Sequence, residues 1–140
     1  MYNKILVTTD GSEGSKAAVD HASEIAKEFD SSVSILYVVD VRKGPQNVID
    51  VIRHGFEEIG REVTEKIKDE LQSKDISAEA YIEYGIPYEQ ILDFSKQEDI
   101  DMIVMSTHGR TGLDRLLIGS VTEKIVRNSK VPVLTVGRDQ

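Results

Sequence analysis

The sequence predicts a single-domain α/β protein built on an open, mainly parallel sheet of five strands with helices on both faces. Short apolar runs alternate with longer segments in which apolar residues recur every three or four positions, in the order β-α-β-α-β-α-β-α-β. Strands separated by helices pair in parallel through right-handed crossovers. The length of 140 residues fits one domain over residues 1–140, large enough for a substantial core.

The first half of the chain contains two expected strands and two expected helices. Residues 4–9 are a short apolar run that stops at Asp10, which is typical of a buried strand. Apolar residues at helical spacing predict an amphipathic helix over residues 15–29. β-branched residues predict a strand over residues 32–39, and a long helix is expected from about residue 47 to residue 73.

Two glycines lie in the first half of this long helix. Gly55 and Gly60 each weaken a helix by up to ~1 kcal/mol relative to alanine. We therefore expect this part of the helix to be irregular or mobile.

Two further strands are expected at the edges of the sheet. Residues 77–84 alternate between apolar and polar side chains, which indicates a strand with one exposed face. The last expected strand, residues 131–137, contains Pro132, which a central strand would not tolerate. A short helix over residues 88–98 follows the first of these two strands.

A loop with glycines joins the fourth expected strand, residues 102–106, to the last expected helix, residues 120–128. Glycine lets backbone N–H groups approach a ligand closely, and the unpaired N–H groups of a helix start favour an anion such as phosphate. Ser120 precedes Glu123 by three residues, which predicts a capping box that begins the helix. The alternative is an ordinary turn between a strand and a helix.

The carboxyl ends of the first and fourth strands are the expected ligand site. In open parallel sheets, ligands bind beyond the carboxyl ends of the strands, where the winding direction reverses. Residues 8–12 follow the first strand, and the glycine loop follows the fourth. If these two strands are neighbours, both loops face one crevice.

The distribution of charge suits a small anionic ligand. A formal net charge of −8 argues against nucleic acid as a partner, because a phosphate backbone needs a basic surface. Residues 102–138 nevertheless contain six basic residues and two acidic ones. The cations at Arg127 and Lys130 equally suit the C-terminus of a helix.

Several classes of site are not expected. The chain has no cysteine, which excludes disulfides, thiolate metal sites and thiol catalysis. His21, His54 and His108 fall on different expected elements, so a histidine metal site is not expected. The N-terminal apolar run is too short for a signal peptide, and no window approaches ~18 consecutive apolar residues. We expect a cytoplasmic protein with no membrane partner.

Two motifs and the last expected strand stand out together. Residues 108–120 read H-G-R-T-G-L-D-R-L-L-I-G-S, with Ser106 three residues before Gly109. The first strand ends in V-T-T-D-G-S at residues 7–12, and the last strand contains P-V-L-T-V. With these motifs the chain resembles the universal stress protein family over its whole length. Nucleotide-binding members of that family carry a glycine, two residues, a second glycine, nine residues and then Gly-Ser or Gly-Thr, which this chain matches except at the first glycine, where Ser106 stands. The resemblance implies a Rossmann-like, adenine nucleotide alpha hydrolase-like sheet with strand order 3-2-1-4-5.

The resemblance also implies a binding site for ATP, with AMP or ADP as alternatives and Mg²⁺ accompanying the phosphates. Asp10 and Thr9 would hold the ribose, and the backbone of Val38 would contact the adenine edge. Met105 and Ser106 would wall the nucleoside. The phosphates would be held by backbone and hydroxyl groups of Gly109, Gly119, Ser120, Val121 and Thr122.

Three neighbouring features bear on this site. Ser106 replaces a glycine near the expected ribose, where its Cβ and hydroxyl either crowd the ligand or add a hydrogen bond. Residues 41–60 follow the second strand and are a candidate lid over the adenine. The segment G-S-E-G-S-K at residues 11–16 lacks the spacer and the Gly-Lys-Ser/Thr ending of a phosphate loop, so we expect a turn there.

Three functions remain open on the sequence. The first is a small stress-response regulatory protein that binds ATP or another adenine nucleotide between strands one and four. The second is a nucleotide-free interaction module that acts through a dimer surface on an unidentified protein partner. The third is an ATPase. Its hydrolysis is expected to be slow, because phosphoryl transfer needs a positioned base and a cation clamp, and Asp10 is the one carboxylate that the sequence places at the crevice.

Self-association is expected at the last strand. An apolar strand at a sheet edge is either protected or paired with another chain. The resemblance implies a homodimer in which this strand pairs across a two-fold axis, an isologous contact. The side chains expected in that contact belong to Val131, Val133, Leu134 and Val136.

Overall fold

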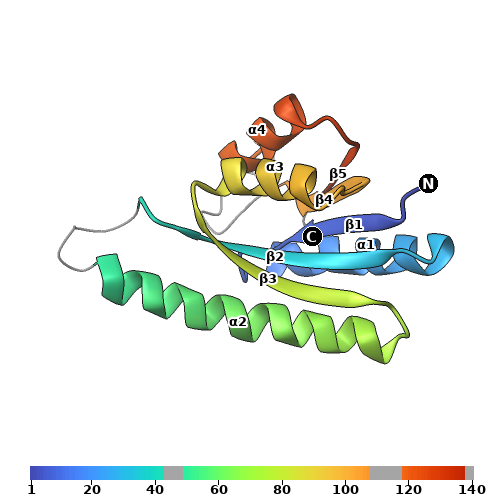
Figure 1. The fold of residues 1–140 in the computed structure, drawn as a ribbon, viewed down its shortest axis with the longest axis horizontal. Helices are drawn as coiled ribbons and strands as arrows, with labels where there is room; N and C mark the ends of the chain where they lie inside the picture. Colours follow the sequence, from blue (N-terminus) through green and yellow to red (C-terminus); the bar gives the residue numbers. More distant parts are fainter. Residues whose placement is uncertain (43–48, 108–117, 138–140) are drawn as a thin grey trace.

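The computed structural model describes residues 1–42, 49–107 and 118–137, with the backbone alone for residues 49–52. Five parallel strands form one sheet in the order β3-β2-β1-β4-β5 (Figure 1). The predicted fold class and strand order are therefore confirmed. The strands are β1 (Lys4–Thr8), β2 (Ser32–Asp40), β3 (Ala78–Gly85), β4 (Met102–Ser106) and β5 (Val133–Val136).

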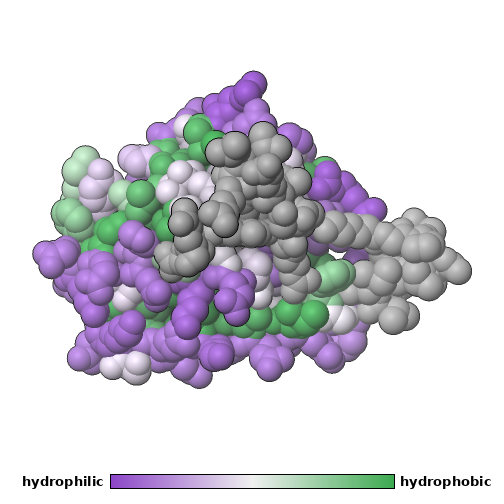
Figure 2. All heavy atoms as spheres, turned by 180° about the vertical axis from the view of Figure 1, so that it is seen from behind, coloured by the Kyte–Doolittle hydropathy of each residue, from purple (hydrophilic) through white to green (hydrophobic). Residues whose placement is uncertain are grey.

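Helices cover both faces of the sheet. The first pair, α1 (Glu13–Phe29) and α2 (Ile49–Ser73), packs on one face, and the second pair, α3 (Pro87–Gln97) and α4 (Ser120–Asn128), packs on the other (Figure 1). Most of the described surface seen from behind is hydrophilic, as expected for amphipathic helices with their apolar sides turned inward (Figure 2). None of these described helices is long and apolar enough to cross a membrane.

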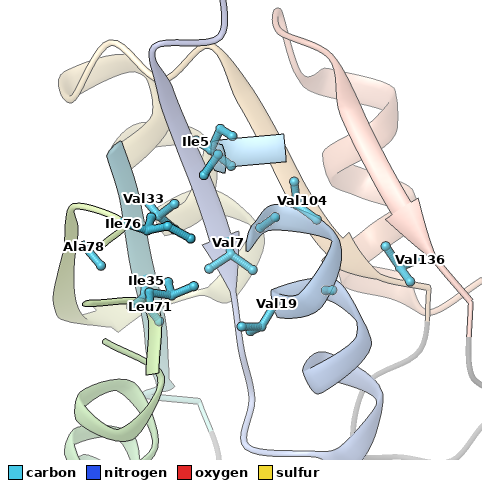
Figure 3. Close-up of a cluster of buried hydrophobic side chains, with 13 residues drawn as sticks. Ile5, Val7, Val19, Val33, Ile35, Leu71, Ile76, Ala78, Val104 and Val136 are labelled. Carbon is cyan, nitrogen blue, oxygen red and sulfur yellow. The ribbon is translucent and has the colours of Figure 1, made fainter. Parts of the chain in front are cut away.

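The central strand β1 supplies both halves of the core. Successive side chains of a strand point to opposite faces of a sheet. Ile5 and Val7 accordingly lie on the α1 and α2 face with Val19 and Leu71 (Figure 3), whereas Leu6 packs on the α3 and α4 face. Because β1 pairs with β2 on one side and β4 on the other, the carboxyl ends of these three strands meet at one edge of the sheet.

The two predicted edge strands are confirmed, although their boundaries differ: β3 is displaced by one residue at each end, and β5 is shorter at both ends. β3 and β5 are the outermost strands of the sheet. β5 begins at Val133 rather than at residue 131. Pro132 accepts a hydrogen bond from the Ile103 N–H at 3.0 Å through its carbonyl. Because proline has no N–H to donate to a neighbouring strand, Pro132 lies just before β5 and not within it.

α2 is helical through both of its glycines, so the predicted irregularity is wrong for the described residues 49–73; residues 47 and 48 lie outside them. Gly55 is exposed, with no atom within 4 Å of where a Cβ would stand. Gly60 is buried against β2, and a Cβ there would lie 2.5 Å from Cδ1 of Tyr37. Gly60 therefore permits a close approach of helix and strand instead of breaking the helix.

The predicted capping box at the start of α4 is wrong. The helix has Gly119 as its N-cap, and no side chain caps it. The Glu123 N–H donates to the Gly119 carbonyl at 3.0 Å, while the Glu123 carboxylate accepts a hydrogen bond from Arg127 at 2.7 Å. Ser120 is already inside the helix, so its side chain is one position too late to cap the first turn.

Candidate functional site

A cleft of about 410 Å³ opens at the carboxyl edge of the sheet, a volume typical of small-molecule sites. It is bounded by the ends of β1, β2 and β4, by the first turns of α3 and α4, and by one side chain of α2. The lining residues are Thr8, Thr9, Asp10, Ser15, Leu36, Tyr37, Val38, Val39, Asp40, Arg42, Phe56, Pro87, Ile91, Met105, Ser106, Gly119, Ser120, Val121 and Thr122.

The expected site residues are brought together here. Each of them that falls in the described ranges lines the cleft, namely Thr9, Asp10, Val38, Met105, Ser106, Gly119, Ser120, Val121 and Thr122. Gly109 and His108 lie outside the described residues. A cleft is thus present at the carboxyl ends of β1 and β4, which are direct neighbours, while residues 108–117 of the loop after β4 lie outside the described residues.

The turn after β1 holds Asp10 at the cleft. Gly11 has φ 82°, a left-handed conformation that side chains other than glycine adopt at a cost. One carboxylate oxygen of Asp10, Oδ1, accepts the Ser12 N–H at 2.9 Å. The other oxygen, Oδ2, receives no hydrogen bond within the described part of the chain, so Asp10 can accept a hydrogen bond from a ligand.

The end of β2 presents backbone groups to the cleft. The pairing of β1 with β2 ends at Thr8 opposite Leu36, whereas β2 continues to Asp40 alongside β3. The Thr9 N–H donates to the Leu36 carbonyl at 3.0 Å, so the peptide groups of Leu36 face the β1 side. Two residues further, Val38 faces that side again, beyond the end of β1. Its N–H and carbonyl therefore face the cleft as one donor and one acceptor.

An ion pair stands at the mouth of the cleft. The Arg42 guanidinium binds both carboxylate oxygens of Asp40, with Nε 3.0 Å from Oδ1 and Nη2 2.9 Å from Oδ2. The hydrogen bond with Asp40, together with its negative charge, raises the pKa of Arg42 above its usual value. Asp10, Asp40 and Arg42 carry the charges among the described lining residues.

Apolar side chains form walls on both sides of the cleft. Phe56 comes from α2 on one face of the sheet, and Ile91 comes from α3 on the other. Met105 and Val121 complete this lining from the end of β4 and the first turn of α4. A slot between apolar walls with backbone polar groups at its end suits a flat heterocyclic ring.

The first turn of α4 presents backbone N–H groups. The first N–H that bonds within this helix belongs to Glu123, so those of Ser120, Val121 and Thr122 precede the intrahelical ladder. The Gly119 N–H already donates to the Thr107 carbonyl at 2.8 Å. These helix N–H groups, together with the helix dipole, favour an anion.

The side chain of Thr122 ties this turn to β4. Its hydroxyl donates to the Ser106 carbonyl at 2.9 Å, and the residue is only 4% exposed. The hydroxyl proton is therefore used inside the protein, although the resemblance implies a phosphate contact for it. Thr122 positions the start of α4 against the end of β4.

Metal ligation by protein side chains has no support in residues 1–42, 49–107 and 118–137. No group of three or more His, Asp or Glu side chains in these ranges could hold a metal ion. His21 is exposed on α1, and His54 is exposed on α2 with its Nε2 3.2 Å from Glu58.

Comparison with known proteins agrees with this architecture. A model of the universal stress protein family matches residues 1–137. The chain belongs to this family. Universal stress protein MJ0531 of Methanocaldococcus jannaschii is 38% identical over 140 residues, an alignment that covers 97% of this chain and 82% of that protein.

Two solved structures of universal stress proteins extend the comparison. The structure of MJ0577 from the same organism has a TM-score of 0.90 at 34% identity and covers 100% of this chain and 99% of that one. The crystal structure of a universal stress protein in complex with cAMP has a TM-score of 0.70 at 26% identity and covers 97% of both chains. The Rossmann-like α/β fold of the family is therefore that of this chain.

Several lining residues of this universal stress protein were missed from sequence. Asp40 and Arg42 directly follow the apolar run of β2, and charged residues at such a strand end are a signal that could have revealed them. Phe56 lies in the segment expected to act as a lid. Ser15 and Ile91 lie on helices, where periodicity indicates burial but not which neighbour covers the side chain.

Proposed function

We propose that this universal stress protein is a small cytoplasmic regulatory protein that binds ATP, or another adenine nucleotide, in the cleft between β1 and β4. The observation that carries the proposal is the meeting, in one cleft, of the Asp10 carboxylate, the Val38 peptide groups and the N–H groups of the first turn of α4. The carboxylate can accept hydrogen bonds from the hydroxyls of a sugar, the peptide groups can pair with the edge of a base, and the helix N–H groups can bind a phosphate. The cAMP complex of a 26% identical family member supports the choice of an adenine ligand.

Each part of the nucleotide has a proposed place. The adenine edge would bond the N–H and carbonyl of Val38, with Met105 and Ser106 beside the nucleoside. Asp10 and Thr9 would hold the ribose. The phosphates, with Mg²⁺ as an accompanying ion, would bind the backbone of Gly109, Gly119, Ser120, Val121 and Thr122. Phe56 would cover the base from α2, which supports a lid-like role for part of the segment 41–60.

Calorimetric titration of nucleotide-stripped protein tests the proposal. ATP, AMP and GTP are compared with and without Mg²⁺, for the unmodified chain and for Gly119→Ala, which adds a Cβ to a residue that lines the cleft at the start of α4. Gly137→Ala is the matched control, because no atom lies within 4 Å of its added Cβ. Saturable ATP binding that only Gly119→Ala weakens is the expected result. Absence of binding at millimolar concentrations of all three nucleotides would refute the proposal.

A second candidate function is an interaction module that works as a homodimer through β5. The edge position of this strand favours it, because the valines and the leucine of β5 pack inward on both faces while its outer edge meets no other strand among the described residues. Pairing of two β5 strands across a two-fold axis would cover that edge with the same strand of a second copy. The residues proposed for this contact are Val131, Val133, Leu134 and Val136. Slow ATP hydrolysis is a third candidate; it requires turnover that Asp10→Ala or Gly119→Ala abolishes with the fold intact, and turnover that survives both substitutions would point to a contaminating enzyme.

A further inference from the structure

A series of three hydrogen bonds joins the end of β1 to the first turn of α1. The Gly11 N–H donates to Oγ1 of Thr9 at 3.1 Å. Oγ1 of Thr9 lies 2.9 Å from Oγ of Ser15, and this Oγ donates to the Ser12 carbonyl at 2.7 Å. This series of hydrogen bonds thus starts at the Gly11 N–H and ends at the Ser12 carbonyl, within the same turn.

The direction of every bond in this series is determined. A carbonyl oxygen can only accept, so the single hydroxyl proton of Ser15 goes to Ser12. Thr9 must then donate its own proton to Ser15 while it accepts the N–H of Gly11. Thr9 and Ser15 are 6% and 5% exposed, so water offers little replacement if either hydroxyl is removed.

This network encloses Asp10. On one side of Asp10, the Thr9 N–H is anchored to Leu36 of β2 at 3.0 Å. On the other side, Gly11 and Ser12 are held through the two hydroxyls, and Oδ1 of Asp10 is fixed by the Ser12 N–H. The network therefore sets both the backbone and the side-chain orientation of Asp10, and leaves Oδ2 without a hydrogen-bond partner among the described residues.

We propose that Ser15, acting through Thr9, is a positioning residue that aims the Asp10 carboxylate at the vicinal hydroxyls of a bound ribose. This inference rests on the proposed nucleotide-binding function and names a residue outside the set expected from sequence. It assigns Ser15 an effect on ligands that carry both ribose hydroxyls, and none on the recognition of base or phosphate.

Ser23 provides a matched control on the same helix. It is also buried, at 2% exposure, but its hydroxyl has no hydrogen-bond partner among the residues that the structure describes. Replacement of Ser23 by alanine therefore removes a buried hydroxyl from α1 without breaking a hydrogen bond.

The experiment titrates nucleotide-stripped full-length protein with ATP and with 2′,3′-dideoxy-ATP. Ser15→Ala should weaken ATP binding about three- to tenfold, as expected for a misplaced charged hydrogen bond, and change dideoxy-ATP binding by less than about twofold. Ser23→Ala should leave both affinities unchanged. In an Asp10→Ala background, Ser15→Ala should add less than about a twofold further loss, because the two residues act through one contact. Ser15→Cys, which keeps the size of the side chain but has only a weak S–H donor and a weak sulfur acceptor, replaces Ser15→Ala if that variant does not fold.

The outcomes separate this inference from the proposed function. Equal weakening of both ligands by Ser15→Ala would mean general loosening of the site and would overturn the positioning role, as would no weakening at all. Failure of the unmodified protein to bind ATP, AMP or GTP at millimolar concentrations would refute the proposed function together with this inference.

Discussion

Adding a methyl group at each of the two glycines of α2 should have opposite effects on stability. Both positions are in the interior of the same helix, so replacement by alanine brings the same gain in helix propensity, up to ~1 kcal/mol. At Gly55 nothing lies within 4 Å of the new Cβ. Gly55→Ala should therefore stabilise the protein by nearly the full gain.

At Gly60 the same methyl group collides with a buried ring. The new Cβ would lie 2.5 Å from Cδ1 of Tyr37 and 2.9 Å from its Cγ and Cε1, and Tyr37 is 4% exposed. Overpacking of a tight interior costs about 1–3 kcal/mol, which offsets or exceeds the gain in propensity. The two alanine variants should therefore differ by about 1–3 kcal/mol in their free energy of unfolding. At roughly 3–4 °C per kcal/mol for a domain of this size, Gly60→Ala should melt about 3–12 °C below Gly55→Ala.

Thermal and urea denaturation followed by far-UV circular dichroism measure this difference. A third variant, Tyr37→Leu, removes the ring, so Gly60→Ala should cost less in that background than in the unmodified protein. Equal stability of the two alanine variants, or a cost at Gly60 that does not depend on Tyr37, would refute the reasoning.

Three further predictions concern the sheet edge, a surface carboxylate and the start of α4. Val133→Lys should give monomers if β5 forms the dimer contact, and a variant that sediments as a dimer at micromolar concentration would exclude that contact. Hydrogen bonding to the Tyr84 hydroxyl lowers the pKa of Glu57, so ionised Glu57 stabilises the fold at higher pH and this contribution is lost as the pH falls through the lowered pKa. Tyr84→Phe should raise that pKa in an NMR titration, and an unmoved pKa would contradict the assignment. Thr122→Val should destabilise the protein by about 0.5–1.5 kcal/mol, because the hydrogen bond from the Thr122 hydroxyl to the Ser106 carbonyl is lost; urea denaturation with an unchanged midpoint would count against this.

The amino-acid sequence by itself determined the elements and the edge of the sheet that carries the cleft. Apolar runs that stop abruptly, as at Asp10 and Ser106, mark strand ends because a buried strand excludes polar groups. Pro132 marked the edge strand for the same local reason, the missing N–H. The resemblance of V-T-T-D-G-S to the family signature supplied the strand order, which periodicity alone does not contain.

Only the tertiary structure decided which neighbours share the cleft and how their polar groups are used. Gly60 looks like a helix breaker along the chain, yet its role depends on Tyr37, 23 positions away in sequence, at the point where α2 packs on β2. Ser15 and Thr122 carry polar side chains on helices, and nothing in their local pattern says that one bonds to Thr9 and the other to Ser106. The physical reason is that periodicity records burial along one element, whereas the identity of the partner depends on strand register and on how closely the elements pack.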